Sequence, residues 1–319
     1  MLETWGLFLL GLVFLMLGGD SVVKGASGVA RHYGLSPFVT GLVLVAFATS
    51  IPELVVNGRA AWVGAQSLAL GNAVGSNLVN FGLTLGLAAI GATGALVVRW
   101  RVLSPLLVCF IVLGIATIGL GFDGVLSRTD GMLLLLAFAA VVAFALARSR
   151  GDSADVQKVL TDFTETRGGL GLNGARLVIS AIVLFYGAKW VVQSAPTVGA
   201  SMGMGPLLTG LVPVAIGTAL PEIAAAVIAA RRGQGELVAG HVIGSSLCNL
   251  TLVLGGMASF RALPLPASFV KFELPAAIAF AIALYPMLRG DLRISRIEGG
   301  ILVAAYAAWL VFVLASGTH

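Results

Sequence analysis

The sequence predicts an all-α integral membrane protein with about ten transmembrane helices, built as two inverted five-helix repeats with broken helices at the membrane midplane. Three observations support this fold: the composition, the spacing of the polar breaks and an internal duplication. Of the 319 residues, 58% are hydrophobic and only 10% are charged, whereas a soluble domain contains roughly 25% charged residues. The 42 glycines suit the close packing of helices in lipid.

Polar breaks divide the chain into ten apolar spans, each long enough to cross about 30 Å of hydrocarbon at about 1.5 Å per residue. The longest polar stretch, 149–172, is predicted to be a cytoplasmic linker loop between a first five-helix repeat, 1–148, and a second, 173–319. The predicted spans cover residues 5–30, 36–63, 67–92, 102–122, 130–148, 173–200, 205–231, 236–260, 266–288 and 296–317.

The distribution of basic residues predicts the orientation of the chain in a cell membrane. Of the 19 lysines and arginines, fourteen belong to the loops that follow odd-numbered spans, four belong to the other side, and Lys189 falls within a span. Basic loops face the cytoplasm, so both termini are expected outside, and the net charge of +5 does not indicate nucleic-acid binding. Cys109 and Cys248 both lie in apolar segments, which implies no disulfide framework.

Two pairs of segments reveal the duplication. "PFVTGLVLVAFATSIPEL" (37–54) aligns with "PLLTGLVPVAIGTALPEI" (206–223), and "LALGNAVGSNLVNFGLTL" (68–85) aligns with "LVAGHVIGSSLCNLTLVL" (237–254). The offset is 169 in both cases, and 21 of the 49 positions from 37 to 85 are identical at that offset. Because five spans separate equivalent points, the second copy crosses the membrane in the opposite direction, as in many secondary transporters. The paired polar residues are Thr49 and Thr218, Pro52 and Pro221, Glu53 and Glu222, Ser76 and Ser245, and Asn80 and Asn249.

The two Pro-Glu pairs predict a cation site. Pro52 and Pro221 should interrupt their helices, because a proline cannot donate to the carbonyl four residues back and its ring crowds that carbonyl. A freed carbonyl is tolerated in a membrane only where it faces protein or a wet cavity. Glu53 and Glu222 follow these prolines, and two carboxylates brought together in a membrane are very costly without a cation. Carboxylates and carbonyls are the ligands that a hard cation such as Ca²⁺ prefers.

A polar helix face accompanies each Pro-Glu pair. Its residues are spaced i, i+4, i+8, so they lie on one side of a helix. In the second copy a histidine replaces the first asparagine, and we interpret His241 as a packing or interfacial residue. The two faces are Asn72, Ser76 and Asn80 in the first copy, and His241, Ser245 and Asn249 in the second.

Both motif pairs closely resemble the two α-repeats of the calcium/cation antiporter superfamily, most closely those of the prokaryotic sodium/calcium exchangers. The matching segments are "GLVLVAFATSIPEL" with "GNAVGSNLVN", and "GLVPVAIGTALPEI" with "GHVIGSSLCN". The resemblance implies a secondary antiporter that exchanges Ca²⁺ for Na⁺ by alternating access in the lipid bilayer. It implies transported Ca²⁺ and Na⁺ but no cofactor, no catalysis and no obligate protein partner.

The resemblance also assigns the ligands residue by residue. Ca²⁺ is expected between Glu53 and Glu222, joined by the backbone carbonyls of Thr49 and Thr218. The remaining expected ligands are hydroxyls, amides and carbonyls around that centre. They are Ser50 and Ser76 at one flanking Na⁺ site, Ser245 at the other, carbonyls of Ala46 and Ala215, and the mid-depth pair Asn80 and Asn249.

Three departures from the family pattern bear on the coupling ion. Ala219 replaces the usual serine, Asn249 replaces an aspartate common in prokaryotic relatives, and the acidic residue often found before Gly-Asn is absent at 68–70. A proton- or potassium-coupled divalent cation antiporter therefore stays open, although the proton-coupled motif GNATE is missing. Paired carboxylates in a membrane could also belong to a Ca²⁺-binding membrane sensor or to an intramembrane enzyme. The chain shows neither an output domain nor a G-x-G-D, HExxH or Ser/His signature.

Overall fold

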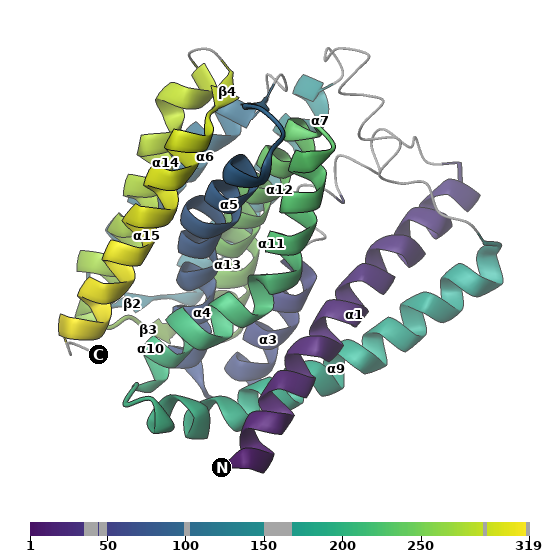
Figure 1. Cartoon of the computed structure of the whole chain (residues 1–319). Coiled ribbons are helices and arrows are strands. Elements are labelled where there is room, and N and C mark those ends of the chain that lie inside the picture. Colours follow the sequence, from purple (N-terminus) through teal and green to yellow (C-terminus); the bar gives the residue numbers. More distant parts are fainter. Residues whose placement is uncertain (35–43, 45–49, 99–102, 150–167, 290–291, 317–319) are drawn as a thin grey trace.

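The computed structural model describes residues 1–34, 44, 50–98, 103–149, 168–289 and 292–316. Two long helices, α1 (Leu2–His32) and α9 (Leu170–Ser201), lie side by side along their length, and the other long helices form a bundle next to this pair (Figure 1). At the end opposite to the two termini, the pair leans away from the bundle (Figure 1).

The bundle consists of helices from both parts of the chain, several of them continued through a π-helical turn. From the first part come α3 (Ile51–Trp62), α4 (Gln66–Leu78), η2 (Val79–Thr84), α5 (Leu85–Gly91), α6 (Leu103–Leu120) and α7 (Arg128–Ser149). From the second part come α10 (Pro206–Thr209), η3 (Gly210–Val214), α11 (Ala215–Arg231), α12 (Gly235–Cys248), η4 (Asn249–Val253), α13 (Leu254–Phe260), η5 (Phe269–Glu273), α14 (Leu274–Arg289) and α15 (Arg296–Ser316).

The all-α membrane fold is confirmed. Within the described residues, eight helices are long and apolar enough to cross a membrane, and a ninth span is the bent pair Pro206–Leu220 and Glu222–Arg231. The bend of 47° falls at Pro221, where the sequence predicts an interruption. Much of the second predicted span, 36–63, lies outside the described residues, and α3 is its main described part.

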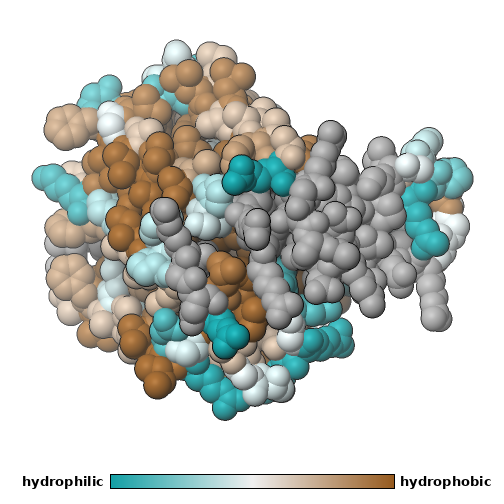
Figure 2. Space-filling view, turned by 90° about the horizontal axis from the view of Figure 1, so that it is seen from above, coloured by the Kyte–Doolittle hydropathy of each residue, from teal (hydrophilic) through white to brown (hydrophobic). Residues whose placement is uncertain are grey.

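The outer surface has the character of a lipid-facing surface. Apolar side chains cover much of the outline of the bundle when it is viewed from the end opposite to the termini (Figure 2). Exposed apolar residues of this kind lie on the outer helices. The spans Gln66–Gly91 and Gly235–Phe260 are central: 83% and 89% of their most apolar 18-residue segments is buried inside the protein. The polar residues on these two central spans are therefore shielded from lipid by the other helices. Examples of the exposed residues are Leu9, Val112, Ile115, Ile179, Ile182 and Phe312.

Two short antiparallel strand pairs tie the two parts of the chain together. β1 (Leu96–Val97) pairs with β4 (Arg293–Ile294), and β2 (Val125–Leu126) pairs with β3 (Leu263–Pro264). Each pair joins a loop of the first part to a loop of the second, at opposite ends of the bundle (Figure 1). The loops at both ends therefore hold the central helices in a fixed relation.

Glycines bring the backbones of α4 and α10–η3 into direct contact. A Cβ atom at Gly71 would collide with the carbonyl oxygen of Leu207, and one at Gly210 would collide with that of Leu68. Only glycine lets two helices approach this closely. This contact sets the distance between α4, which carries Ser76, and the helix that leads to Glu222.

We expect Gly71→Ala to lower the apparent melting temperature of the detergent-solubilised protein by roughly 5 °C, because overpacking costs about 1–3 kcal/mol. Gly58→Ala is the matched control, since no atom lies within 4 Å of a Cβ built at Gly58 in α3. Melting followed by fluorescence measures both variants. Equal melting temperatures for the two variants would show that the α4–η3 contact adapts without cost.

Candidate functional site

Two buried carboxylates lie within electrostatic range of each other. Glu53 is in the first turn of α3 and is 0% exposed, while Glu222 follows the bend in α11 and is 7% exposed. Both oxygens of Glu53, and Oε1 of Glu222, accept no hydrogen bond from any described residue. The positive end of α3 favours a negative charge at Glu53, but no described lysine or arginine pairs with either carboxylate. Within the described part of the chain, no basic side chain other than His241 is placed to neutralise these two carboxylates.

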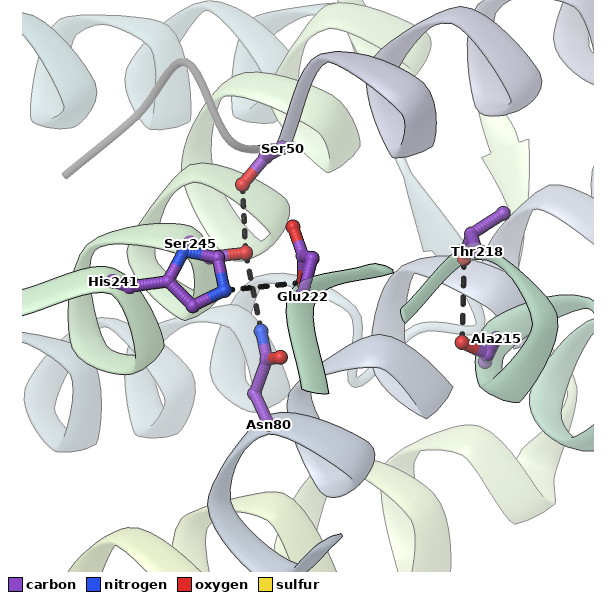
Figure 3. A network of polar contacts seen from close by, with 7 residues as sticks. All are labelled: Ser50, Asn80, Ala215, Thr218, Glu222, His241 and Ser245. Carbon is purple, nitrogen blue, oxygen red and sulfur yellow. Dashed lines mark hydrogen bonds and ion pairs between the residues drawn. The ribbon is translucent and has the colours of Figure 1, made fainter. Parts of the chain in front are cut away.

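Three predicted residues meet beside these carboxylates. The hydroxyl of Ser50, at the start of α3, donates to Oγ of Ser245 on α12, with 2.7 Å between the oxygens (Figure 3). Nδ2 of Asn80 on η2 donates to the same Ser245 oxygen at 3.1 Å (Figure 3). All three residues are at most 1% exposed. The contact joins the Glu53 helix to the second central span.

The equivalent positions at the offset of 169 do not form this cluster. The counterparts of Ser50, Ser245 and Asn80 are Ala219, Ser76 and Asn249. Ala219 has no hydroxyl, and Oγ of Ser76 has no hydrogen-bond partner among the described residues. Neither polar side-chain atom of Asn249 has one either, although both residues are at most 1% exposed. The Ser50–Ser245–Asn80 hydrogen bonds therefore have no equivalent in the other half, where Ser76 and Asn249 lack a described hydrogen-bond partner altogether.

The threonine positions are only partly described. The Thr218 hydroxyl donates to the carbonyl oxygen of Ala215 on its own helix, at 3.3 Å (Figure 3). The Thr218 side chain also lies within interaction range of Glu53, so it contacts both a carbonyl near the bend and a carboxylate of the site. The predicted residues Thr49 and Ala46 lie outside the described residues.

His241 lies closer to the site than the sequence suggested. Its Nε2 is 3.4 Å from Oε2 of Glu222, and the residue is 7% exposed (Figure 3). Its interpretation as a packing or interfacial residue missed this contact. A signal was available in the alignment: the offset replaces Asn72 by His241 and Asn57 by Ala226. Asn72 donates to Oδ1 of Asn57 at 3.0 Å, so the second copy has lost both members of a buried hydrogen bond.

Cys248 is a second neighbour that sequence analysis did not assign to the site. It is 1% exposed, and its thiol lies beside Ser50 and within electrostatic range of Glu53 and Glu222. Among the described residues, no group of three or more His, Cys, Asp or Glu side chains converges as a metal centre. A cation held by the two glutamates would therefore complete its coordination with hydroxyl, amide or backbone oxygens, which suits a hard ion.

The comparisons with known proteins agree with this geometry. The family model described as "Sodium/calcium exchanger protein" matches residues 3–147 and 173–315. The chain belongs to the sodium/calcium exchanger family. It is 31% identical to the sodium/calcium exchanger MaX1 of Methanosarcina acetivorans, over 96% of this chain and 97% of that relative. It is also 31% identical to the inner membrane protein YrbG of Escherichia coli, over 80% of this chain and 79% of that relative.

A solved structure of the sodium–calcium exchanger NCX_Mj, soaked with 2.5 mM Na⁺ and 10 mM Sr²⁺, has a similar fold. The TM-score is 0.68 at 28% sequence identity, over 97% of this chain and 98% of that one. Proteins of the sodium/calcium exchanger family are antiporters rather than enzymes. This member is accordingly a multi-pass membrane protein of a cation-antiport family, and the predicted resemblance to the calcium/cation antiporters is confirmed.

Proposed function

We propose that this protein exchanges Ca²⁺ for Na⁺ by alternating access, and that both ions use the site between Glu53 and Glu222. The observation that carries the proposal is the pair of buried carboxylates without a lysine or arginine partner among the described residues. Their combined charge of about −2 matches one Ca²⁺ or several Na⁺ ions in turn. Because the two cargoes compete for one set of oxygens, the protein cannot carry both together, and exchange follows.

The unpaired oxygens of two predicted ligands support a hard cation. Ser76 Oγ and Asn249 Oδ1 are buried without a hydrogen-bond partner in the described part of the chain. A buried polar atom is costly unless it has a partner, so a coordinated ion would satisfy both. The relatives MaX1 and NCX_Mj are named as sodium/calcium exchangers, which supports the same pair of ions here.

The α1–α9 pair has the contacts expected of a moving unit. A Cβ atom at Gly11 would lie 2.9 Å from the carbonyl oxygen of Gly187, and the reverse contact is equally short. The pair touches the bundle at fewer places, including Gly19 beside Pro52 and Gly217 beside Leu12. We propose that α1 and α9 slide together past the bundle to switch access. In this arrangement the termini face the outside, as the basic loops predict.

A flux experiment tests the proposed function. The purified protein is reconstituted into proteoliposomes, and ⁴⁵Ca²⁺ uptake is measured with gradients of Na⁺, K⁺ or H⁺ imposed one at a time. An outward Na⁺ gradient alone is expected to drive uptake. If an H⁺ or K⁺ gradient drives uptake and a Na⁺ gradient does not, the coupling ion is H⁺ or K⁺ and not Na⁺. Saturable Ca²⁺ binding without any flux would mark the protein as a sensor.

Ala219→Ser is expected to lower the Na⁺ concentration for half-maximal exchange about three- to tenfold, since one additional hydroxyl interaction contributes about 0.5–1.5 kcal/mol. The variant restores a hydroxyl at the equivalent of Ser50. In the structure Ser50 bonds Ser245, and the equivalent of Ser245 is Ser76, whose oxygen is unpaired among the described residues. The measurement is Na⁺-dependent ⁴⁵Ca²⁺ flux across a range of Na⁺ concentrations, with Ala219→Cys as a control of similar size that lacks a hard oxygen ligand. An unchanged Na⁺ dependence would mean that water or another group already occupies this position.

A further inference from the structure

The two copies of the repeat treat equivalent positions on α4 and α12 differently. In the first copy, Asn72 on α4 donates to Asn57 on α3 at 3.0 Å, which ties the two helices together. In the second copy, Ala226 on α11 offers no side-chain acceptor, and the residue on α12 is His241. The His241 imidazole does not form the equivalent of the Asn72–Asn57 hydrogen bond. It contacts Glu222 instead, with 3.4 Å between Nε2 and Oε2.

His241 and Glu222 both have polar atoms that are free to bind a ligand. Neither ring nitrogen of His241, nor Oε1 of Glu222, forms a hydrogen bond with a described residue. Both residues are 7% exposed, in contrast to the fully buried Glu53 and Ser245. A polar group buried without a partner is costly, so an imidazole and a carboxylate left open side by side point to a ligand that binds both.

The separation of the two atoms fits a shared cation. An ion about 2.1 Å from a nitrogen and an oxygen that are 3.4 Å apart sees them at an angle of about 110°, close to tetrahedral. Imidazole suits Zn²⁺ and neighbouring transition metals, whereas Ca²⁺ prefers oxygen alone. A mixed nitrogen–oxygen pair therefore favours a borderline divalent cation relative to an all-oxygen site.

A second soft donor lies on the same face of α12. His241, Ser245 and Cys248 are spaced i, i+4, i+7, which places them on one side of the helix. The Cys248 thiol lies beside Ser50 and within electrostatic range of both glutamates. The equivalents of His241 and Cys248 in the first copy are Asn72 and Val79, and neither is a soft ligand. Both donors therefore belong to α12, in the second copy of the repeat.

We propose that His241 and Glu222 together bind a borderline divalent cation, such as Cd²⁺, Mn²⁺ or Zn²⁺, and that this class of ion is a cargo of the antiporter beside Ca²⁺. The inference rests on the proposed function, because it takes Glu222 as part of the transport site. His241 is then the residue that sets the preference among divalent cations.

The test measures binding to the full-length protein in detergent, so that it does not depend on transport. The variant is His241→Asn combined with Ala226→Asn, which recreates the asparagine pair of the first copy and so protects the fold. Loss of even an outer partner of a metal ligand lowers affinity about 10–100-fold. We therefore expect the ratio of Cd²⁺ affinity to Ca²⁺ affinity to be at least about tenfold lower in the double variant than in the wild type. Titration calorimetry measures both affinities.

Electron spin-echo spectroscopy of bound Mn²⁺ gives a second readout. The wild type is expected to show ¹⁴N modulation from a directly bound imidazole, and the double variant to lack it. His241→Cys should keep the Cd²⁺ preference without the nitrogen signal. The matched control is Asn72→Ala, at the equivalent position of the first copy, which should leave the ratio of Cd²⁺ to Ca²⁺ affinity within about twofold, because Asn72 faces Asn57 instead of the carboxylates.

The outcomes separate this inference from the proposed function. If the wild type shows no nitrogen modulation, or if the double variant keeps the wild-type ratio of affinities, His241 only contacts Glu222 and the inference is overturned. If the inference about His241 is overturned but Glu222→Gln loses Ca²⁺ binding, the proposed Ca²⁺/Na⁺ exchange stands without a role for His241. If Glu222→Gln binds both Ca²⁺ and Cd²⁺ like the wild type, the glutamate site itself is wrong and both proposals fail.

Discussion

Glu53→Gln and Glu222→Gln are each expected to abolish Ca²⁺ exchange while the protein stays folded. Two unit charges about 4 Å apart attract by about 4 kcal/mol at an effective dielectric constant of about 20. Loss of one carboxylate charge should therefore weaken Ca²⁺ binding on the order of a thousandfold. The measurement is ⁴⁵Ca²⁺ flux in proteoliposomes, and flux near the wild-type level in either variant would overturn the central-site proposal.

Thermal unfolding distinguishes a lost site from a lost fold. Glu53 is fully buried and has no hydrogen-bond or ion-pair partner among the described residues, so its charge is costly in the absence of Ca²⁺. Glu53→Gln should therefore melt at or above the wild-type temperature in Ca²⁺-free detergent. The wild type should gain about 2.7 kcal/mol when Ca²⁺ is a hundred times its dissociation constant, and the variant should gain nothing.

Asp20→Asn supplies the matched control for these variants. Asp20 also lies on a membrane-spanning helix, but its side chain is 62% exposed and pairs with Lys24 at 2.6 Å. An exposed pair contributes at most about 1 kcal/mol. This variant should keep both exchange and the Ca²⁺-dependent rise in melting temperature, which shows that the effect belongs to the buried carboxylates and not to any acidic residue in a span.

The helical fold was predictable because it depends on patterns that the sequence displays directly. Long apolar segments bounded by polar loops gave span limits within a few residues of the observed ones, as for 173–200 against Leu170–Ser201. Proline chemistry located the bend at Pro221, which the structure places between two helical segments at 47°. Both arguments need only local sequence, since a span and a helix break are properties of a short segment.

The contacts within the site were not predictable in the same way. The offset of 169 shows which residues are equivalent, but it does not show which residues touch. Ser50 meets Ser245 across the bundle, although the family pattern suggested them for separate Na⁺ sites. His241 contacts Glu222, whereas its first-copy equivalent Asn72 bonds Asn57. Such contacts depend on how helices far apart in sequence are packed, and a periodic pattern carries no information about that.

The unequal halves of the polar cluster bear directly on the number of Na⁺ ions. Beside Glu53, the Ser50 and Asn80 side chains both engage Ser245. In the equivalent half, Ala219 provides no hydroxyl, which argues for a weaker Na⁺ site. Ser76 and Asn249 nevertheless offer buried oxygens with no described partner, and these oxygens can replace the missing ligand. We therefore expect three Na⁺ ions to enter for each Ca²⁺ ion expelled.

Exchange of three Na⁺ for one Ca²⁺ is expected to be electrogenic. One net charge moves inward in each cycle, which contributes about 2.3 kcal/mol per 100 mV of inside-negative potential. Since about 1.4 kcal/mol corresponds to a factor of ten, 100 mV should change the Ca²⁺ ratio at equilibrium about 50-fold. The measurement is the reversal point of ⁴⁵Ca²⁺ flux in proteoliposomes with fixed Na⁺ and Ca²⁺ gradients and a potential set by K⁺ and valinomycin. A reversal point that ignores the potential would mean that only two Na⁺ ions bind, and that Ser76 and Asn249 do not replace the hydroxyl missing at Ala219.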